Sequence, residues 1–148
     1  MPPKILVICG PTASGKTALA VELALRHHGE VVSADSMQIY RRMDIGTAKP
    51  TPEEMGGVPH HMLDVADPEE DFSVARYVEM AARCVDDVLE RGKLPIVAGG
   101  TGLYIDSLLS GRTFAPFSPD SALRGELERE LAQRGGPAML EALRQVDP

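Results

Sequence analysis

The sequence contains little cysteine and no long apolar run. Its 148 residues include two cysteines, Cys9 in a short apolar run and Cys84 in a helical pattern. Cysteines so placed predict small core residues rather than a disulfide framework, which is typical of a reducing compartment. The longest apolar runs are far too short for a signal peptide or a membrane-spanning helix. We therefore expect a cytoplasmic protein without a membrane partner.

An excess of positive charge is also missing. Lysine and arginine together number 15, aspartate and glutamate 22, and the formal net charge is −7. Nothing global indicates nucleic-acid binding, so a polyanion would have to meet a local basic patch. With 43% hydrophobic and 25% charged residues, the composition is that of an ordinary globular protein. The length allows one domain with a real core.

The strongest chemical signal lies in residues 10–17, between an apolar run at 5–9 and a helix-like pattern at 18–23. Every fixed position of the phosphate-loop pattern G-x-x-x-x-G-K-[ST] is matched by Gly10-Pro11-Thr12-Ala13-Ser14-Gly15-Lys16-Thr17. Gly10 and Gly15 are predicted to take backbone angles closed to other residues, so that N–H groups turn inward. Lys16 and the helix N-terminus would add positive charge, and the Thr17 hydroxyl could ligate a divalent ion. The loop therefore predicts a phosphate site rather than an incidental glycine-rich turn.

The rest of the pattern predicts an α/β fold of the P-loop NTPase type, with three layers around a parallel sheet. Strands buried on both faces are expected at 4–9, 30–34 and 94–98, and helices at 16–27, 74–91 and 103–109. Gly29 is expected to end the first of these helices, and Ser73 to cap the second. Residues 36–72 predict a long loop-rich excursion, which is usually functional.

After Gly111 the sequence changes character. Residues 113–119 predict a linker in which Ser118 and Pro119 begin a helix. Two amphipathic helices, at 119–134 and 137–145, are then expected, with a break at Gly135-Gly136-Pro137. We divide the chain into a phosphate-loop core, residues 1–112, and the start of a helical insertion, residues 113–148. Because three strands make a thin sheet, we expect the sequence to stop partway through a larger protein.

Asp35 is the second residue with predicted chemistry, because it follows a strand at the edge where ligands of open α/β sheets gather. It could hold a metal-bound water, act as a general base or cap a helix. The capping alternative is specific, since Asp35-Ser36-Met37-Gln38 resembles a capping box in which Gln38 reaches back to the cap. The third strand ends in Gly99-Gly100-Thr101 rather than in the aspartate of a nucleotide hydrolase. A transferase with a diphosphate leaving group therefore fits better than a nucleotide-driven motor.

Two further groups of residues have open interpretations. Arg41, Arg42 and Lys49 could contact nucleotide phosphates, but a solvated loop explains them at least as well. His60 and His61 lack the i, i+4 spacing and the cysteine partner of a zinc site, so we expect no metal there.

Five motifs in order resemble the tRNA dimethylallyltransferases, also called tRNA isopentenyltransferases. They are the phosphate loop, Asp-Ser-Met-Gln-Ile-Tyr-Arg at 35–41, Asp-Ile-Gly-Thr-Ala-Lys-Pro at 44–50, Pro-His-His at 59–61 and Gly-Gly-Thr-Gly-Leu-Tyr at 99–104. The resemblance is close over residues 4–111 and looser beyond. It implies transfer of a dimethylallyl group from dimethylallyl diphosphate, with Mg²⁺, to N6 of adenosine 37. The acceptors would be tRNAs that read codons beginning with U, bound through the anticodon stem-loop by a monomer.

The same resemblance implies roles for single residues. Residues 12–17 would hold the prenyl diphosphate, with Lys16 on its oxygens and Thr17 on Mg²⁺. Asp35 would accept the N6 proton, and Thr101 would lie in the reaction channel, so both are candidate catalytic residues. Contacts with tRNA are implied for Asp35, Ser36, Met37, Gln38, Thr101 and Arg124, and residues 113–148 would begin a tRNA-binding insertion.

Three alternatives stay open beside this one. An adenylate isopentenyltransferase would prenylate free AMP, a phosphate-loop kinase would phosphorylate a small molecule, and a non-catalytic fragment would only bind. The run at 44–50 and the Pro-His-His motif favour the tRNA branch. Members of the resembled family are considerably longer, so we expect the 148-residue piece alone to be inactive.

Overall fold

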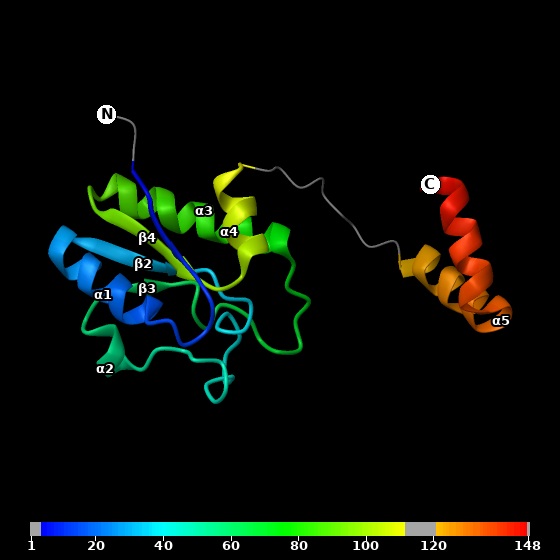
Figure 1. The fold of residues 1–148 in the computed structure, drawn as a ribbon, viewed down its shortest axis with the longest axis horizontal. Coiled ribbons are helices and arrows are strands. Elements are labelled where there is room, and N and C mark those ends of the chain that lie inside the picture. Colours follow the sequence, from blue (N-terminus) through cyan, green and yellow to red (C-terminus); the bar gives the residue numbers. More distant parts are fainter. Residues whose placement is uncertain (1–3, 112–120, 148) are drawn as a thin grey trace. The chain divides into compact units, whose positions relative to one another are not determined.

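The computed structural model describes residues 4–111 and 121–147, and the chain divides into one unit at 1–113 and another at 114–148. The first unit runs β1 (Leu6–Cys9), α1 (Lys16–His27), β2 (Gly29–Ser33), α2 (Pro52–Met55), β3 (His60–His61), α3 (Val74–Glu90), β4 (Leu94–Gly99) and α4 (Gly102–Leu109) (Figure 1). The second unit holds α5 (Ser121–Val146). None of the helices in the described ranges has the length and apolarity needed to cross a bilayer.

The sheet of the first unit is parallel and has the strand order β1-β4-β2-β3. Val31 pairs with Ile96, and Val32 pairs with Val97. Because successive side chains of a strand point to opposite faces, Val31 and Ile96 pack with α1, whereas Val32 and Val97 pack with α3 and α4. The predicted three-layer α/β fold is confirmed, with helices covering both faces of the sheet (Figure 1).

Two tyrosines fix the helical layer of α3 and α4 against the end of β2. Tyr77 is fully buried, and its hydroxyl donates a hydrogen bond to the Ser33 carbonyl oxygen at 3.0 Å. Its ring stacks on that of Tyr104, with ring centroids 4.1 Å apart. These contacts pack α3 and α4 against the strand end that leads into Asp35.

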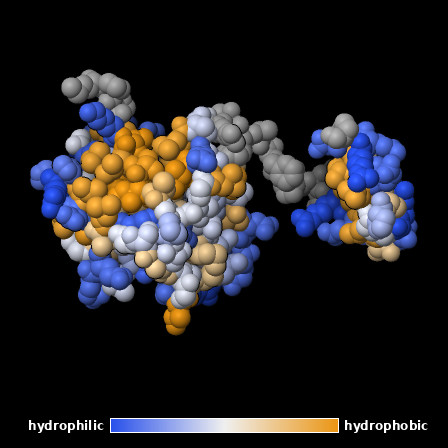
Figure 2. Space-filling view, viewed as in Figure 1, coloured by the Kyte–Doolittle hydropathy of each residue, from blue (hydrophilic) through white to orange (hydrophobic). Residues whose placement is uncertain are grey.

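β1 differs from the expected strand buried on both faces. Its Leu6, Val7 and Ile8 are half-buried and its Cys9 is exposed. The reason is its place in the sheet order, since β1 pairs with β4 alone among the described strands. Figure 2 shows apolar residues gathered over the face along which β1 runs. The prediction of a core position was therefore wrong for Cys9, whereas Cys84 is half-buried.

The excursion at 36–72 contains two short elements that the sequence pattern does not predict. α2 begins with a capping box, in which Thr51 Oγ1 accepts from the Glu54 N–H and Glu54 Oε2 accepts from the Thr51 N–H. β3 adds a fourth strand beside β2, through His60 and His61. A strand of two residues and a helix of four are too short to produce a periodic signal.

The end of α1 is made by His28 rather than by Gly29. His28 takes the left-handed conformation with φ 53°, and Gly29 already belongs to β2. Gly29 is required for a different reason, since a Cβ there would lie 2.7 Å from the Leu94 carbonyl oxygen. The other helix limits agree with prediction within two residues, including the Ser73 cap of α3.

The second unit consists of two helical segments separated by a kink. Gly135 has non-helical backbone angles, φ 77° and ψ 165°, and Pro137 follows it, which confirms the predicted break. The predicted linker at 113–119 and its Ser118-Pro119 helix start lie outside the described residues.

Candidate functional site

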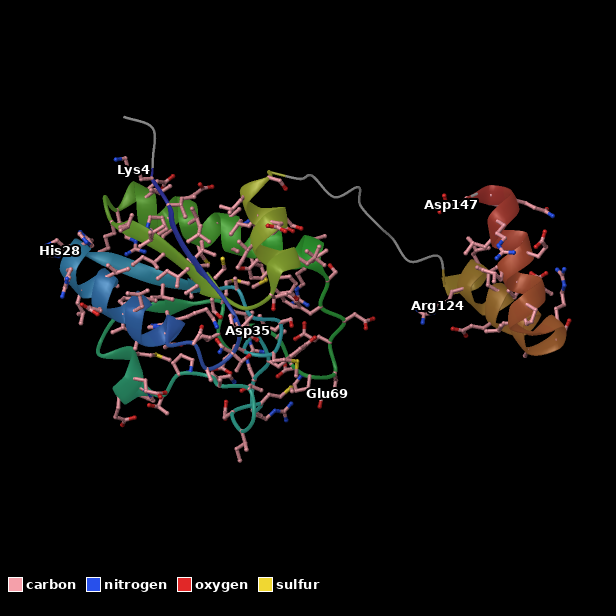
Figure 3. All side chains as sticks on the ribbon, in the orientation of Figure 1. Lys4, His28, Asp35, Glu69, Arg124 and Asp147 are labelled. Carbon is pink, nitrogen blue, oxygen red and sulfur yellow. The ribbon has the colours of Figure 1, made fainter. Side chains whose placement is uncertain are left out.

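The carboxyl ends of three strands carry the residues that the sequence singles out. The phosphate loop follows β1, Asp35 follows β2, and Thr101 follows β4. Figure 3 shows Asp35 beside the blue loop that leaves β1. The turns after β2 and β4 are bonded to each other, because the Ala34 N–H donates to the Ala98 carbonyl at 2.8 Å and the Thr101 N–H donates to the Ala34 carbonyl at 3.1 Å.

A cleft of about 360 Å³ lies at this edge. Its size is that of a small-molecule site. The phosphate loop, the turn at Asp35 and the segment 48–50 form most of its walls, which consist of Thr12, Ala13, Ser14, Gly15, Lys16, Thr17, Ala18, Asp35, Gln38, Ala48, Lys49, Pro50, Glu54, Ala98 and Gly99. The structure therefore brings the predicted phosphate site and the predicted carboxylate into one cavity.

The phosphate loop makes its sharp turns at Ala13 and Gly15, with φ 62° and 82°. The left-handed conformation predicted for Gly15 is present, but Gly10 does not take a positive φ. Ala13 takes it instead, at a cost of about 1–2 kcal/mol for a residue with a Cβ. Strain of this kind concentrates at functional sites. α1 then begins at Lys16, so its first N–H groups lie in the wall of the cleft.

Lys16 lies folded over its own loop. Its ammonium donates to the Pro11 carbonyl oxygen, which also accepts from the Ser14 hydroxyl at 2.8 Å. Lys16 and Thr17 are half-buried, and both line the cleft. An ammonium has three donors, so this arrangement leaves Lys16 able to meet an anion beside the loop.

Asp35 is half-buried and begins a turn rather than a helix. Its Oδ1 accepts from the Met37 N–H at 2.9 Å and the Gln38 N–H at 3.4 Å. The Gln38 side chain does not reach back as the capping box requires. Its Oε1 accepts from the Ser33 hydroxyl at 2.9 Å, and its Nε2 donates to the Ala48 carbonyl at 2.9 Å. Within the described residues Oδ2 of Asp35 accepts no hydrogen bond, so this oxygen can receive a proton.

Thr101 lies behind the Asp35 turn. Its Oγ1 accepts from the Ser36 N–H at 3.0 Å and donates to the Ser36 hydroxyl at 3.4 Å. Thr101 does not line the cleft as Asp35 does. Met37 is 44% exposed at the rim of the same turn.

The three basic residues of the segment 35–50 are bonded to carboxylates of the same unit. Arg41 lies 3.2 Å from Asp67, and Arg42 lies 3.3 Å from Glu69. The Lys49 ammonium lies 2.6 Å from Asp44 and 2.7 Å from Asp64. Each of the three cations therefore already has a carboxylate partner within the unit and needs no phosphate as a counter-ion.

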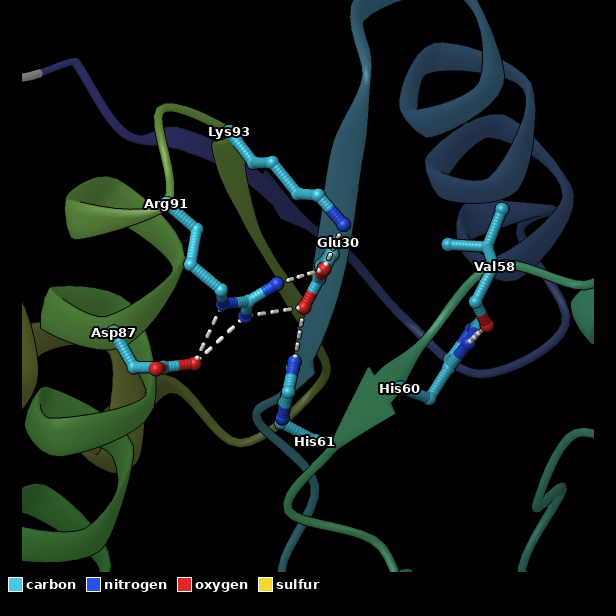
Figure 4. Close-up of polar contacts among 7 residues, drawn as sticks. All are labelled: Glu30, Val58, His60, His61, Asp87, Arg91 and Lys93. Carbon is cyan, nitrogen blue, oxygen red and sulfur yellow. Dashed lines mark hydrogen bonds and ion pairs between the residues drawn. The ribbon is translucent and has the colours of Figure 1, made fainter.

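Sequence reasoning missed an ion cluster near the amino ends of β2 and β4, outside the cleft lining (Figure 4). Glu30, 2% exposed, accepts from Arg91 at 2.8 Å, Lys93 at 2.6 Å and His61 Nε2 at 2.7 Å. The hydrogen bonds from Arg91 outweigh the effect of burial and, with those from Lys93 and His61, hold the pKa of Glu30 far below its usual range. The available signal was a single glutamate inside an apolar strand, which has to find a cation.

The neighbouring His60 is bonded to the backbone rather than to the ion cluster. Its Nδ1 donates to the Val58 carbonyl at 2.9 Å, and Nε2 is buried without a partner in the described residues. Burial lowers the pKa of His60 and keeps the ring neutral. No group of three or more histidine, cysteine or acidic residues in the described ranges could hold a metal ion.

Arg124 belongs to the second unit. Its side chain is 78% exposed and pairs with Glu128, one turn further along α5, at 3.1 Å (Figure 3). The predicted tRNA contact of Arg124 stays a prediction.

The chain matches known proteins over nearly its whole length. The family model for IPP transferase matches residues 38–148. The tRNA dimethylallyltransferase 1 of Pelobacter propionicus is 58% identical over 146 residues, which are 99% of this chain and 47% of that protein. The tRNA dimethylallyltransferase of Acetivibrio thermocellus is 54% identical over 144 residues, 97% of this chain and 46% of that protein. The chain spans about half the length of the curated relatives that it matches.

Solved structures give the same result. The full-length tRNA isopentenylpyrophosphate transferase of Bacillus halodurans superposes with a TM-score of 0.75 at 48% identity, over 98% of this chain and 48% of that one. A eukaryotic dimethylallyltransferase solved in the act of modifying tRNA has a TM-score of 0.72 at 34% identity, over 79% of this chain and 30% of that one. These neighbours confirm the predicted fold class. The chain belongs to the IPP transferase family.

Proposed function

We propose that the chain is the phosphate-loop part of a tRNA dimethylallyltransferase. A protein of the relatives' full length would transfer the dimethylallyl group of dimethylallyl diphosphate to N6 of adenosine 37, in tRNAs that read codons beginning with U. The names of the relatives support the activity and the tRNA acceptor. The observation that carries the proposal is the shared cleft, because prenyl transfer requires an anion site and a proton acceptor within the reach of one substrate pair.

The donor would be held by residues 12–17. The first N–H groups of α1, the N–H groups of the loop and the Lys16 ammonium would together supply positive charge at the cleft, whose lining includes residues 12–18. One charge at a helix N-terminus gains only about 0.3–1 kcal/mol, so several such groups have to act together. Negative charge grows on the diphosphate as the carbon–oxygen bond breaks, and preorganised donors stabilise that charge.

Mg²⁺ fits the side chains present. The cleft offers the Thr17 hydroxyl, and oxygen is the ligand that Mg²⁺ prefers. Mg²⁺ commonly binds through one or two protein oxygens together with substrate phosphates and water, so a full protein cage is not required. Bound there, the ion would neutralise charge on the leaving diphosphate.

Asp35 would act as the general base. An aromatic amine is a poor nucleophile, so removal of its proton as the carbon–nitrogen bond forms contributes typically about 10²–10⁴-fold. The Met37 and Gln38 N–H groups hold Oδ1 and so orient the carboxylate, while Oδ2 accepts the proton. The adenine has to leave its stack to reach this cleft, where it would meet the turn of residues 35–38. Thr101, bonded to Ser36, would keep that turn in place.

The proposal is tested in two steps. The 148-residue chain is titrated with dimethylallyl diphosphate and with ATP, and we expect the prenyl donor to bind at least about tenfold more tightly, which is about 1.4 kcal/mol. Transfer is then measured after the chain is grafted in place of the matching half of the Bacillus halodurans relative. Labelled donor is offered with tRNA that lacks the modification, or with AMP.

Label on tRNA supports the proposal. Product on AMP alone would overturn it in favour of an adenylate isopentenyltransferase, and formation of ADP with a phosphorylated acceptor would indicate a kinase. The ungrafted 148-residue chain is assayed in the same way, and we expect it to bind donor without turnover.

A further inference from the structure

Lys49 forms part of the cleft wall, but its ammonium is bonded to protein oxygens. Its side chain is 6% exposed, and its Nζ lies 2.6 Å from Asp44 Oδ1 and 2.7 Å from Asp64 Oδ1. The third donor goes to the Tyr40 carbonyl oxygen at 2.8 Å. An ammonium has three donors, so none is left for a phosphate. One positive and two negative charges make the trio net negative, which further disfavours an anion.

These three contacts join the segment that holds Tyr40, Asp44 and Lys49 to the turn that holds Asp64. Tyr40 and Asp44 lie before the cleft-lining residues 48–50, and Asp64 lies in the turn that leads from β3 to Ala66. The same two segments are bonded through their backbones, where the Arg41 N–H donates to the Ala66 carbonyl at 2.8 Å. The ammonium of Lys49 is therefore one point at which this cleft wall is attached to the rest of the unit.

The backbone at this point is strained. Ala48 and Asp64 have φ values of 51° and 54°, in the left-handed region that residues with a Cβ rarely adopt. Such conformations persist only where the surroundings hold them. Burial opposes the charge of Lys49, but the hydrogen bonds to Asp44 and Asp64 outweigh it and raise the pKa, so the lysine stays charged.

A short path of contacts connects Lys49 to Asp35. Gln38 Nε2 donates to the carbonyl of Ala48, the residue before Lys49, at 2.9 Å. The backbone N–H of Gln38 in turn donates to Asp35 Oδ1 at 3.4 Å. A displacement of the segment 47–50 would therefore move an amide that orients the Asp35 carboxylate.

We propose that Lys49 is a positioning residue for prenyl transfer, which fixes the 48–50 wall of the cleft and, through Ala48 and Gln38, the orientation of Asp35. This inference rests on the proposed function for the identity of the reaction. It assigns Lys49 no contact with the donor diphosphate. A displacement of about 1 Å at a reacting group can cost about 10²-fold in rate, so the contribution of Lys49 would be to the rate rather than to donor binding.

The test separates donor affinity from rate in Lys49→Met, which keeps the length of the side chain and removes its charge. In the grafted full-length protein we expect kcat to fall about 10–100-fold. In the 148-residue chain we expect the dissociation constant for dimethylallyl diphosphate to stay close to that of the wild type. Loss of a direct charged hydrogen bond would instead weaken donor binding about tenfold or more, and that result would overturn the proposal.

Asp44→Asn and Asp64→Asn provide a second, opposite test. If Lys49 is a positioning residue, both substitutions loosen the same wall and lower kcat with donor affinity retained. If Lys49 contacts phosphate, releasing its ammonium from a carboxylate should tighten donor binding, which would contradict the proposal. Arg83→Met is the matched control, because Arg83 is 76% exposed and pairs with Glu79 outside the cleft lining. We expect its rate and affinity to equal those of the wild type.

Amide hydrogen exchange of the 148-residue chain tests, without any measurement of catalysis, whether Lys49 fixes the segment 44–50. Lys49→Met should speed exchange in residues 44–50 while β2 and β4 keep their protection. Unchanged exchange in 44–50 would overturn the proposal, and so would loss of protection throughout the sheet, because the residue would then be a general support of the fold. A wild-type graft that fails to prenylate tRNA would remove the proposed function, while these exchange rates and donor affinities would still decide the role of Lys49.

Discussion

The Asp35 carboxylate accepts a hydrogen bond from the Met37 backbone N–H at 2.9 Å through Oδ1 alone. The arrangement separates a structural oxygen from one that can accept a proton. Asp35→Asn keeps a carbonyl oxygen for the turn and removes the base. We expect donor affinity to be retained and single-turnover transfer to tRNA to slow at least about 10²-fold. A parallel loss of donor affinity, seen by titration, would make Asp35 a metal ligand instead of the base.

Lys16 is predicted to supply most of the mobile positive charge in the phosphate loop. Lys16→Ala should abolish measurable binding of dimethylallyl diphosphate by the 148-residue chain, because the loop amides and the helix terminus are each weak alone. Lys4→Ala is the matched control, since Lys4 is exposed and lies before β1. Calorimetric titration checks both variants. Equal affinities of the two would remove the phosphate-loop assignment.

The long periodic elements could be predicted from the sequence, because their signals are local. α3 shows this most clearly, since a serine cap, an amphipathic stripe and a glycine stop all lie within one short stretch. β3 could not be predicted, because two residues carry no periodicity and the strand forms only by pairing with β2. The exposure of β1 likewise depends on which strands lie beside it, a property of the whole sheet.

In the candidate site, too, the features with a local sequence signal could be predicted, and those that depend on the folded chain could not. The motif at 10–17 predicts the phosphate loop, and the position of Asp35 after a strand predicts that it lies at the same sheet edge, where ligands gather. Their joint placement in one cleft agrees with that rule. The burial of Lys49 between two aspartates could not be foreseen, because Asp44 and Asp64 reach it only after the excursion at 36–72 has folded back on itself. From the sequence alone, Lys49 could be either a phosphate contact or part of a solvated loop.

Gly99 is predicted to be indispensable for the edge that carries the site. A Cβ at Gly99 would lie 2.1 Å from the Ala34 carbonyl oxygen, a clash with backbone that no side-chain rotation relieves. We expect Gly99→Ala to lower the free energy of unfolding by about 3 kcal/mol or more, the upper range for overpacking. Gly102→Ala is the control, because nothing lies within 4 Å of its added Cβ. Urea unfolding should leave that variant within about 0.5–1 kcal/mol of the wild type, and similar losses in both would contradict the prediction.

The Glu30 cluster predicts how stability depends on pH. Because the pKa of Glu30 is lowered in the folded protein from an ordinary value of 4.5, the charged carboxylate stabilises the fold above that pH. The contribution is lost as pH falls below about 4.5 toward the lower pKa of the folded state. Glu30→Gln removes the charge at every pH and leaves the partly exposed Arg91 and Lys93 to water. We expect a loss of about 2 kcal/mol at pH 7, the scale of hydrogen bonds to a charged group. In urea unfolding curves, the difference between wild type and variant should shrink steadily as pH is lowered from 5 toward 3. A difference that stays constant over that interval would mean that the stabilisation from Glu30 is not the ionic contribution described for Figure 4.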